Sequence, residues 1–161
     1  PFVIAKCGMT LDGRLARRAG EPRWITSAAA RRHAQALRAR VDAILIGAET
    51  LRTDNPRLTV RAQRQAKQPW RIVLSRSGTL PTRARLFTDR FPDRTIVYRN
   101  KNLAVVLKEL GEKEVTSVLI EGGGDILGPA LDQKRINQIQ VYVAPIFPGG
   151  TGFAFPGSGA R

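Results

Sequence analysis

The sequence contains one cysteine, Cys7, and one histidine, His33, among its 161 residues. A single cysteine excludes an internal disulfide, and with one histidine it leaves too few soft ligands for a structural zinc site. The zinc-deaminase signature, His-x-Glu followed by Pro-Cys-x-x-Cys, is missing as well, so this chain is not a zinc deaminase. No apolar stretch approaches the roughly 20 residues that a membrane-spanning helix needs. We therefore expect neither a metal ion nor a membrane partner.

Acidic residues are also scarce, since 13 Asp and Glu stand against 27 Lys and Arg, for a net charge of +14. Such a charge attracts polyanions and phosphorylated small molecules. Nucleic-acid-binding modules present exposed aromatic residues or a dedicated basic helix. Here the basic residues are spread along the chain, and the only tryptophans, Trp24 and Trp70, lie in no basic–aromatic pattern. We therefore expect a phosphate-bearing small molecule as partner and no nucleic acid.

Short apolar runs alternate with helical patterns along most of the chain. The run DAILIG at residues 42–47 is continuous, which is typical of a parallel strand covered on both faces. Ser27 is expected to cap one helix and Gly111 to end another. This alternation predicts one α/β domain with a mostly parallel central sheet flanked by helices. The expected strands are residues 2–7, 42–47, 71–74, 95–98, 116–120 and 138–144, and the expected helices are residues 27–41, 48–53, 103–110 and 125–132.

A glycine loop at residues 117–129, SVLIEGGGDILGP, lies between a buried strand and a helix. Backbone N–H groups at a helix N-terminus bind anions, and glycine lets a pyrophosphate approach closely because it has no Cβ. The spacing is neither the dinucleotide-binding GxGxxG nor a P-loop, which needs Gly-Lys-Ser/Thr. A tight turn that only connects the strand to the helix is the alternative.

Two charged residues lie on the strands that we expect at the centre of the sheet. Lys6 interrupts an apolar strand, and Glu121 follows the carboxyl end of another. Ligands bind outside these ends in open α/β sheets, so Lys6 and Glu121 could face one crevice. An edge lysine and a solvated turn carboxylate are the alternatives. Cys7 is expected in the core, and His33 is expected to be exposed on its helix.

Other residues could bind phosphate groups. Ser75 and Arg76 follow an expected strand, and a hydroxyl beside a guanidinium suits the 2′-phosphate of NADP. Arg38 and Arg61 could together clamp a substrate phosphate through bidentate hydrogen bonds. An ordinary polar turn is the alternative for the first pair, and surface charge is the alternative for each arginine taken singly.

Five segments occur in one order: KCGMTLDGR at residues 6–14, WITS at 24–27, Arg38, DAILIGAETLRTDNPRLTVR at 42–61, and LIEGGG at 119–124. Together they resemble the reductase domain of the riboflavin-biosynthesis deaminase–reductase family, from residue 1 to about 150. The resemblance implies a dihydrofolate-reductase-like fold. It also implies NADPH-dependent reduction of the ribosyl group of 5-amino-6-(5-phosphoribosylamino)uracil to the ribitylamino product. A cytoplasmic homodimer is implied in the same way.

The resemblance also implies which residues do this work. Lys6 and Glu121 would lie at the reacting sugar as catalytic residues. With Ser75 and Arg76 included, the expected NADPH-binding residues are Gly8, Trp24, Thr50, Asp54, Ser75, Arg76, Gly123, Gly124, Asp125, Ile126, Leu127, Gly128 and Pro129. The expected substrate-binding residues are Pro22, Arg38, Leu58, Arg61 and Glu121.

The chain departs from the family in places. Pro22 stands where the family commonly has serine, and Ser75-Arg76 where it often has Asp-Ser. The closing strands of the family are missing after residue 150. We therefore expect residues 1–161 to be a single reductase domain and a piece of a longer protein. Whether a deaminase domain precedes it, and whether the substrate is the uracil or its 2-amino counterpart, are left open by the sequence.

Two alternatives to this function belong to different classes. Dihydrofolate reductase shares the expected fold and cofactor, but it needs an acidic residue on its first long helix. Residues 27–41 contain no Asp or Glu, which argues against it. A basic, non-catalytic nucleic-acid-binding module is the other alternative.

Overall fold

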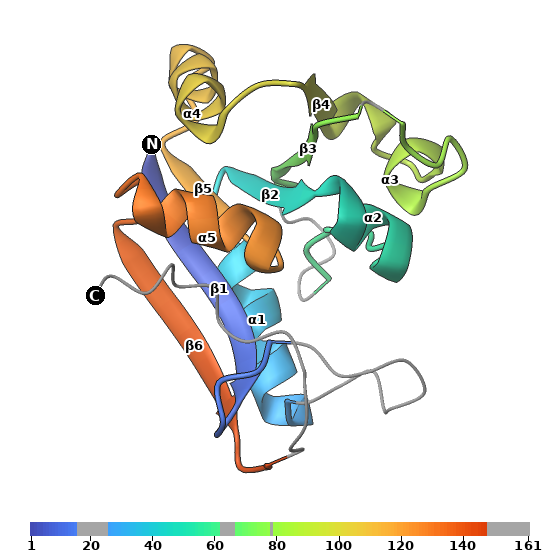
Figure 1. Ribbon diagram of the computed structural model, residues 1–161. Helices are drawn as coiled ribbons and strands as arrows, with labels where there is room; N and C mark the ends of the chain where they lie inside the picture. Colours follow the sequence, from blue (N-terminus) through green and yellow to red (C-terminus); the bar gives the residue numbers. More distant parts are fainter. Residues whose placement is uncertain (16–25, 62–66, 78, 148–161) are drawn as a thin grey trace.

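The computed structural model describes residues 1–15, 26–61, 67–77 and 79–147. These residues form a six-stranded sheet in the order β4-β3-β2-β5-β1-β6, and every neighbouring pair runs parallel (Figure 1). The predicted α/β class with a mostly parallel sheet is confirmed. The strands are β1 (Phe2–Thr10), β2 (Ala43–Gly47), β3 (Trp70–Ser75), β4 (Thr95–Arg99), β5 (Ser117–Ile120) and β6 (Gln138–Ala144).

Helices cover both faces of the sheet. They are α1 (Ala28–Arg38), α2 (Ala48–Asp54), α3 (Arg85–Thr88), α4 (Leu103–Glu112) and α5 (Gly124–Asp132), with a 3-10 helix, η1, at Pro92–Arg94. Leu37 of α1 and Leu51 of α2 pack into one buried cluster, whereas Leu110 of α4 and Leu127 of α5 pack into another. Accordingly, α1 lies behind β1 in Figure 1 and α5 in front of it.

The strand β2 shows why the sequence has an uninterrupted apolar run at this position. Ala43 and Leu45 belong to the cluster of α4 and α5, and Ile44 and Ile46 belong to the cluster of α1 and α2. Because successive side chains of a strand point to opposite faces, a strand covered on both sides needs an apolar residue at every position. All four side chains are fully buried, which confirms the predicted central strand.

The helix ends agree with the sequence only in part. Ser27 caps α1 as predicted, because its Oγ accepts a hydrogen bond from the Ala30 N–H at 3.2 Å. The predicted end of α4 at Gly111 is wrong, since the helix includes Gly111 and ends at Glu112, with Lys113 as its C-cap. The chain then reverses at Glu114, which adopts a φ of 60° without a glycine. α3 and η1 were not predicted, because single-turn helices show no periodicity in sequence.

Candidate active site

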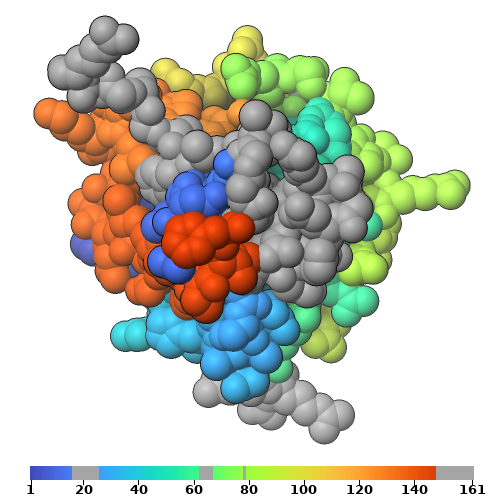
Figure 2. All heavy atoms as spheres, turned by 60° about the horizontal axis from the view of Figure 1, so that its bottom comes forward, coloured from blue at the N-terminus to red at the C-terminus, as the bar shows by residue number. Residues whose placement is uncertain are grey.

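The predicted site segments follow the carboxyl ends of neighbouring strands. Glu121 and the glycine loop follow β5, α2 follows β2, and Ser75 ends β3. Because β3, β2 and β5 are adjacent and parallel, these ends meet at one edge of the sheet. The last pair between β1 and β5 joins Ala5 to Ile120, and from there β1 continues beside β6 alone. Figure 2 views the molecule from this side, where the ends of β1 and β6 lie together next to α1.

A largely buried ionic cluster lies at this edge and consists of Lys6, Arg38 and Glu121. We call it the Glu121 cluster. Arg38 donates two hydrogen bonds to Glu121, from Nε to Oε1 at 2.7 Å and from Nη2 to Oε2 at 2.8 Å. The Lys6 Nζ lies 3.5 Å from Glu121 Oε2. Only 10% of the Glu121 side chain is exposed. The structure thus brings Lys6 and Glu121 together, and neither is an ordinary surface residue.

The cluster keeps Glu121 ionised. Burial alone would raise the pKa of this carboxyl group, since a low dielectric disfavours the charged form. The hydrogen bonds from Arg38 and the positive charges of Lys6 and Arg38 outweigh burial and lower the pKa below its usual range. Glu121 therefore serves as a hydrogen-bond acceptor at neutral pH, not as a proton donor.

Arg38 has a different partner from the one the sequence suggested. Its Nε and Nη2 atoms both donate to Glu121, so this carboxylate occupies one edge of the guanidinium. The two N–H groups of Nη1 and the second N–H of Nη2 form another edge, which can still donate to a phosphate. Arg61 is exposed, and no contact joins it to Arg38 in the described part of the chain. The two-arginine phosphate clamp stays a prediction, in which Arg38 would use the edge of its guanidinium that does not bind Glu121.

The glycine loop has a feature that packing within the protein does not explain. A Cβ at Gly122 would lie 3.4 Å from the Ile126 Cβ, an ordinary packing distance, and one at Gly47 would lie 3.0 Å from the Ile126 Cδ1, which would have to shift. A Cβ at Gly123 would meet no atom of the described residues within 4 Å, and Gly123 has an ordinary φ of −81°. No side chain caps α5 at this residue. Close approach of an anion to the helix N-terminus would explain Gly123.

The rest of the loop divides into exposed and buried residues. Gly124 is partly buried, and Asp125 and Pro129 are exposed. Ile126, Leu127 and Gly128 are buried in the core, because they lie on the side of α5 that packs against the sheet. Any ligand contact from these three must therefore come from the backbone. Asp125 could likewise contact a phosphate only through its backbone, since its carboxylate would repel an anion.

The remaining predicted residues are scattered around this edge. Thr50 and Asp54 lie on α2, and Gly8 lies on β1 opposite Tyr142 of β6. Ser75 is buried, whereas Arg76 is exposed beyond the end of β3. The side chain of Leu58 is buried in the core, so a substrate contact would have to come from its backbone, which adopts a φ of 51°. Pro22 and Trp24 lie outside the described residues.

Sequence reasoning missed two residues near these candidates. Gly47, at the end of β2, lies against the Ile126 side chain of α5, which no pattern in the sequence indicates. Tyr142 lies on the same face of the sheet as Lys6, and the alternation along residues 138–144 could have shown this once the register with β1 was known.

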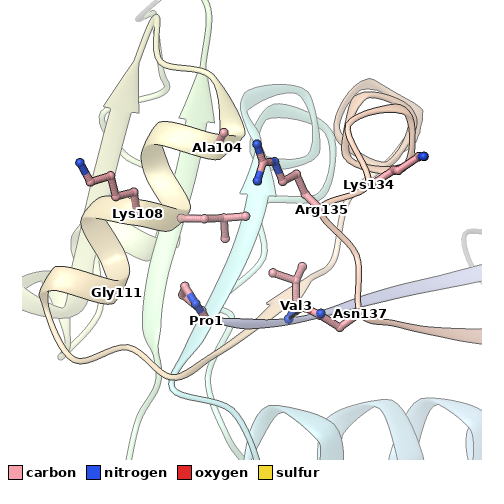
Figure 3. Close-up of a pocket in the computed structure, with 9 residues that line it drawn as sticks. Pro1, Val3, Ala104, Lys108, Gly111, Lys134, Arg135 and Asn137 are labelled. Atoms are coloured by element: carbon pink, nitrogen blue, oxygen red, sulfur yellow. Dashed lines mark hydrogen bonds between the residues drawn. The ribbon is translucent and has the colours of Figure 1, made fainter.

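A hollow of about 400 Å³ lies at the opposite edge, where β1 and β6 begin (Figure 3). Its lining residues are Pro1, Val3, Ala104, Leu107, Lys108, Gly111, Lys134, Arg135 and Asn137. None of the predicted site residues belongs to it. Among the described residues, no helix is long and apolar enough to cross a membrane, and no group of three metal-ligating side chains occurs.

Known proteins resemble this chain over its whole length. The sequence profile of the RibD C-terminal domain matches residues 1–161. The chain belongs to this family. The riboflavin biosynthesis protein RibD of Mycobacterium tuberculosis is 39% identical over 153 residues, and that of Bacillus amyloliquefaciens is 34% identical over 175 residues. The alignments cover 93% and 94% of this chain but 44% and 47% of the relatives, so the chain spans about half of their length.

Solved structures share this fold. RibD of Acinetobacter baumannii superposes with a TM-score of 0.87 at 30% identity, over 96% of this chain and 49% of that chain. A Thermotoga maritima protein, described as a diaminohydroxyphosphoribosylaminopyrimidine deaminase/5-amino-6-(5-phosphoribosylamino)uracil reductase, superposes with a TM-score of 0.81 at 29% identity, over 96% and 48% of the two chains. The expected dihydrofolate-reductase-like fold is confirmed.

Proposed function

We propose that this chain reduces the ribosyl group of 5-amino-6-(5-phosphoribosylamino)uracil to the ribitylamino product, using NADPH. The Glu121 cluster carries the proposal, because it places a buried carboxylate and an ammonium group beside an uncapped helix N-terminus. Family membership supports it, since the Thermotoga maritima relative is described as a reductase of this substrate.

The described residues fit a nicotinamide dinucleotide. Gly123 leaves open space at the start of α5, where backbone N–H groups can bind the pyrophosphate. Gly8 on β1 and Thr50 on α2 would contact the rest of the dinucleotide. The exposed guanidinium of Arg76 is the group that would favour NADPH over NADH by pairing with the 2′-phosphate. When bound, the nicotinamide supplies the hydride.

The protein side of the reaction consists of positioning the sugar. Glu121 would accept a hydrogen bond from a sugar hydroxyl, and Arg38 holds the carboxylate in one orientation. The Lys6 ammonium has three N–H donors, so it can interact with Glu121 and also donate to the ring oxygen of the sugar as the ring opens. Such an arrangement holds the acceptor carbon in place before reduction.

The test is oxidation of NADPH in the presence of the phosphoribosylaminouracil substrate, with identification of the ribitylamino product. Wild-type turnover with this product supports the proposal. A folded protein that binds NADPH but does not reduce the substrate would contradict it. Comparison of the uracil with its 2-amino counterpart then identifies the natural substrate.

Cofactor preference has its own test. A charge-assisted hydrogen bond is worth about 1.5–3 kcal/mol, or roughly tenfold and upward in affinity. We therefore expect NADPH to bind at least about tenfold more tightly than NADH, and Arg76→Ala to remove most of this preference. Equal affinity of the wild type for the two cofactors rules out this role of Arg76.

The resemblance also supports a homodimer in the cytoplasm as part of this proposal. Sedimentation velocity of the purified protein tests the oligomeric state, and a monomer at micromolar concentration contradicts it.

A further inference from the structure

Tyr142 and His33 form a pair that the proposed chemistry has not used. The hydroxyl of Tyr142 lies 2.7 Å from the Nδ1 atom of His33, within hydrogen-bond distance. Their rings meet edge to face, with centroids 5.8 Å apart. Tyr142 is on β6 and His33 is on α1, so the pair connects a strand to the helix that carries Arg38.

The strand register places Tyr142 beside the Glu121 cluster. Gly8 of β1 is paired with Tyr142 of β6, and Lys6 precedes Gly8 by two residues, on the same face of the sheet. Tyr142 packs against the buried cluster on the α1 side of the sheet. Gly8 has no side chain that could separate the phenol ring from Lys6. Burial raises the pKa of Tyr142, and the negative charge of Glu121 raises it further, which agrees with this proximity.

The three side chains of the Glu121 cluster are all charged, and the described part of the chain adds no neutral hydrogen bond to them. Both carboxylate oxygens of Glu121 accept bonds from Arg38, and Oε2 also faces Lys6. Lys6 and Arg38 can only donate. An opened sugar presents several hydroxyl groups, each of which both donates and accepts. A phenol matches such a group, because it keeps acceptor capacity even while it donates a proton to an imidazole.

We propose that Tyr142 is a further substrate-binding residue, whose hydroxyl bonds to a hydroxyl of the opened sugar, and that His33 is a positioning residue that orients the Tyr142 hydroxyl. This inference rests on the proposed function. A purely structural role is the competing explanation, in which the pair only fastens α1 to β6. The two explanations predict different effects of removing the Tyr142 hydroxyl. A substrate-binding role predicts weaker turnover of the substrate, whereas a purely structural role predicts only a less stable fold.

The test is Tyr142→Phe, which removes the hydroxyl and keeps the ring. We expect kcat/KM for the phosphoribosylaminouracil substrate to fall about tenfold, the effect of one lost hydrogen bond. The NADPH dissociation constant and the melting temperature should change little. The matched control is Tyr98→Phe, because Tyr98 lies on β4 at the other end of the sheet and its buried hydroxyl has no hydrogen-bond partner among the described residues. This control should keep wild-type kcat/KM.

His33→Ala tests the positioning role. We expect a smaller loss of kcat/KM than for Tyr142→Phe, and the double variant should be no worse than Tyr142→Phe alone, since His33 acts through the hydroxyl. The inference is overturned if Tyr142→Phe leaves kcat/KM unchanged, or if the losses of the two single variants simply add in the double variant. In either case, the proposed function still stands as long as the wild type reduces the substrate. A wild type that does not reduce this substrate overturns both.

Discussion

Glu121 is the residue on which the candidate site depends most. A carboxylate with 10% of its side chain exposed would be unfavourable alone, and two cations compensate for its charge. The sequence indicated that Lys6 and Glu121 could meet, because both lie near the carboxyl ends of expected parallel strands. The family resemblance placed Arg38 at the same substrate, but no pattern indicated that it would bond to Glu121, since the contact spans 83 positions along the chain and depends on how α1 packs.

At the residue scale, the first prediction concerns Lys6 and Glu121. Lys6→Met and Glu121→Gln should each lower turnover by about a hundredfold or more, as expected for positioned polar groups in catalysis. The NADPH dissociation constant should change little, because neither variant alters the three glycines at residues 122–124 or the start of α5. Steady-state kinetics and fluorescence titration with NADPH measure the two quantities. Near wild-type turnover in either variant would mean that the residue is structural.

Arg38→Lys tests the bidentate bond to Glu121. Lysine keeps the charge but has one nitrogen in place of the planar guanidinium, so it cannot bond to both Glu121 oxygens from fixed positions. Turnover should fall about tenfold or more, and the predicted phosphate contact should make the loss larger for the phosphorylated substrate than for its dephosphorylated form. An equal loss for the two substrates would mean that Arg38 acts through Glu121 alone.

At the element scale, strands were predicted better than the ends of helices. The central strands have apolar residues at every position or alternate, and either pattern can be recognised without knowledge of the fold. Gly111 was expected to end α4 because glycine favours the left-handed region, yet Glu114 adopts that conformation, with a φ of 60°. The backbone hydrogen bond from Val115 to Leu110, 3.1 Å long, stabilises this turn, and such a bond leaves no trace in composition.

Asp42 connects the beginnings of β2 and β5. Its Oδ2 accepts hydrogen bonds from the backbone and side chain of both Thr116 and Ser117, the shortest being 2.6 Å from the Thr116 hydroxyl. We expect Asp42→Asn to lower the free energy of unfolding by about 1–2 kcal/mol at pH 7. Turnover should not change, because these residues lie at the edge opposite the Glu121 cluster.

The pH dependence of Asp42→Asn gives a second check. The hydrogen bond from the Thr116 side chain is the largest cause that lowers the pKa of Asp42, although burial opposes it. Because the pKa of Asp42 is lower in the folded protein than its unfolded value of about 3.9, the ionised carboxylate stabilises the fold at pH values above this. The stabilisation is lost as the pH falls through the pKa of the folded state. The stability difference between wild type and variant should therefore shrink below about pH 4. A difference that stays constant down to pH 2 would contradict this account.

At the scale of the whole molecule, the sheet and its two buried clusters could be predicted, but the buried charges could not. Arg71 was expected only as part of a strand, yet it is 1% exposed. Its guanidinium donates to the Asp89 carboxylate at 2.6 Å and to the carbonyl oxygens of Arg57, Leu86 and Phe91. These partners come from segments far apart in the sequence, so only the assembled fold brings them together.

Arg71 therefore connects β3 to the segment around α3 and to the segment that precedes Leu58. Arg71→Met should lower the free energy of unfolding by about 3–5 kcal/mol, because it leaves the Asp89 carboxylate without its partner. Chemical denaturation measures this loss. The double variant Arg71→Met with Asp89→Asn should recover part of it, since no unpaired charge remains. Lys108→Met is the control, because Lys108 forms an exposed pair with Glu112, 3.9 Å long, whose removal should cost less than about 1 kcal/mol. If Arg71→Met costs no more than this control, the buried pair does not stabilise the fold.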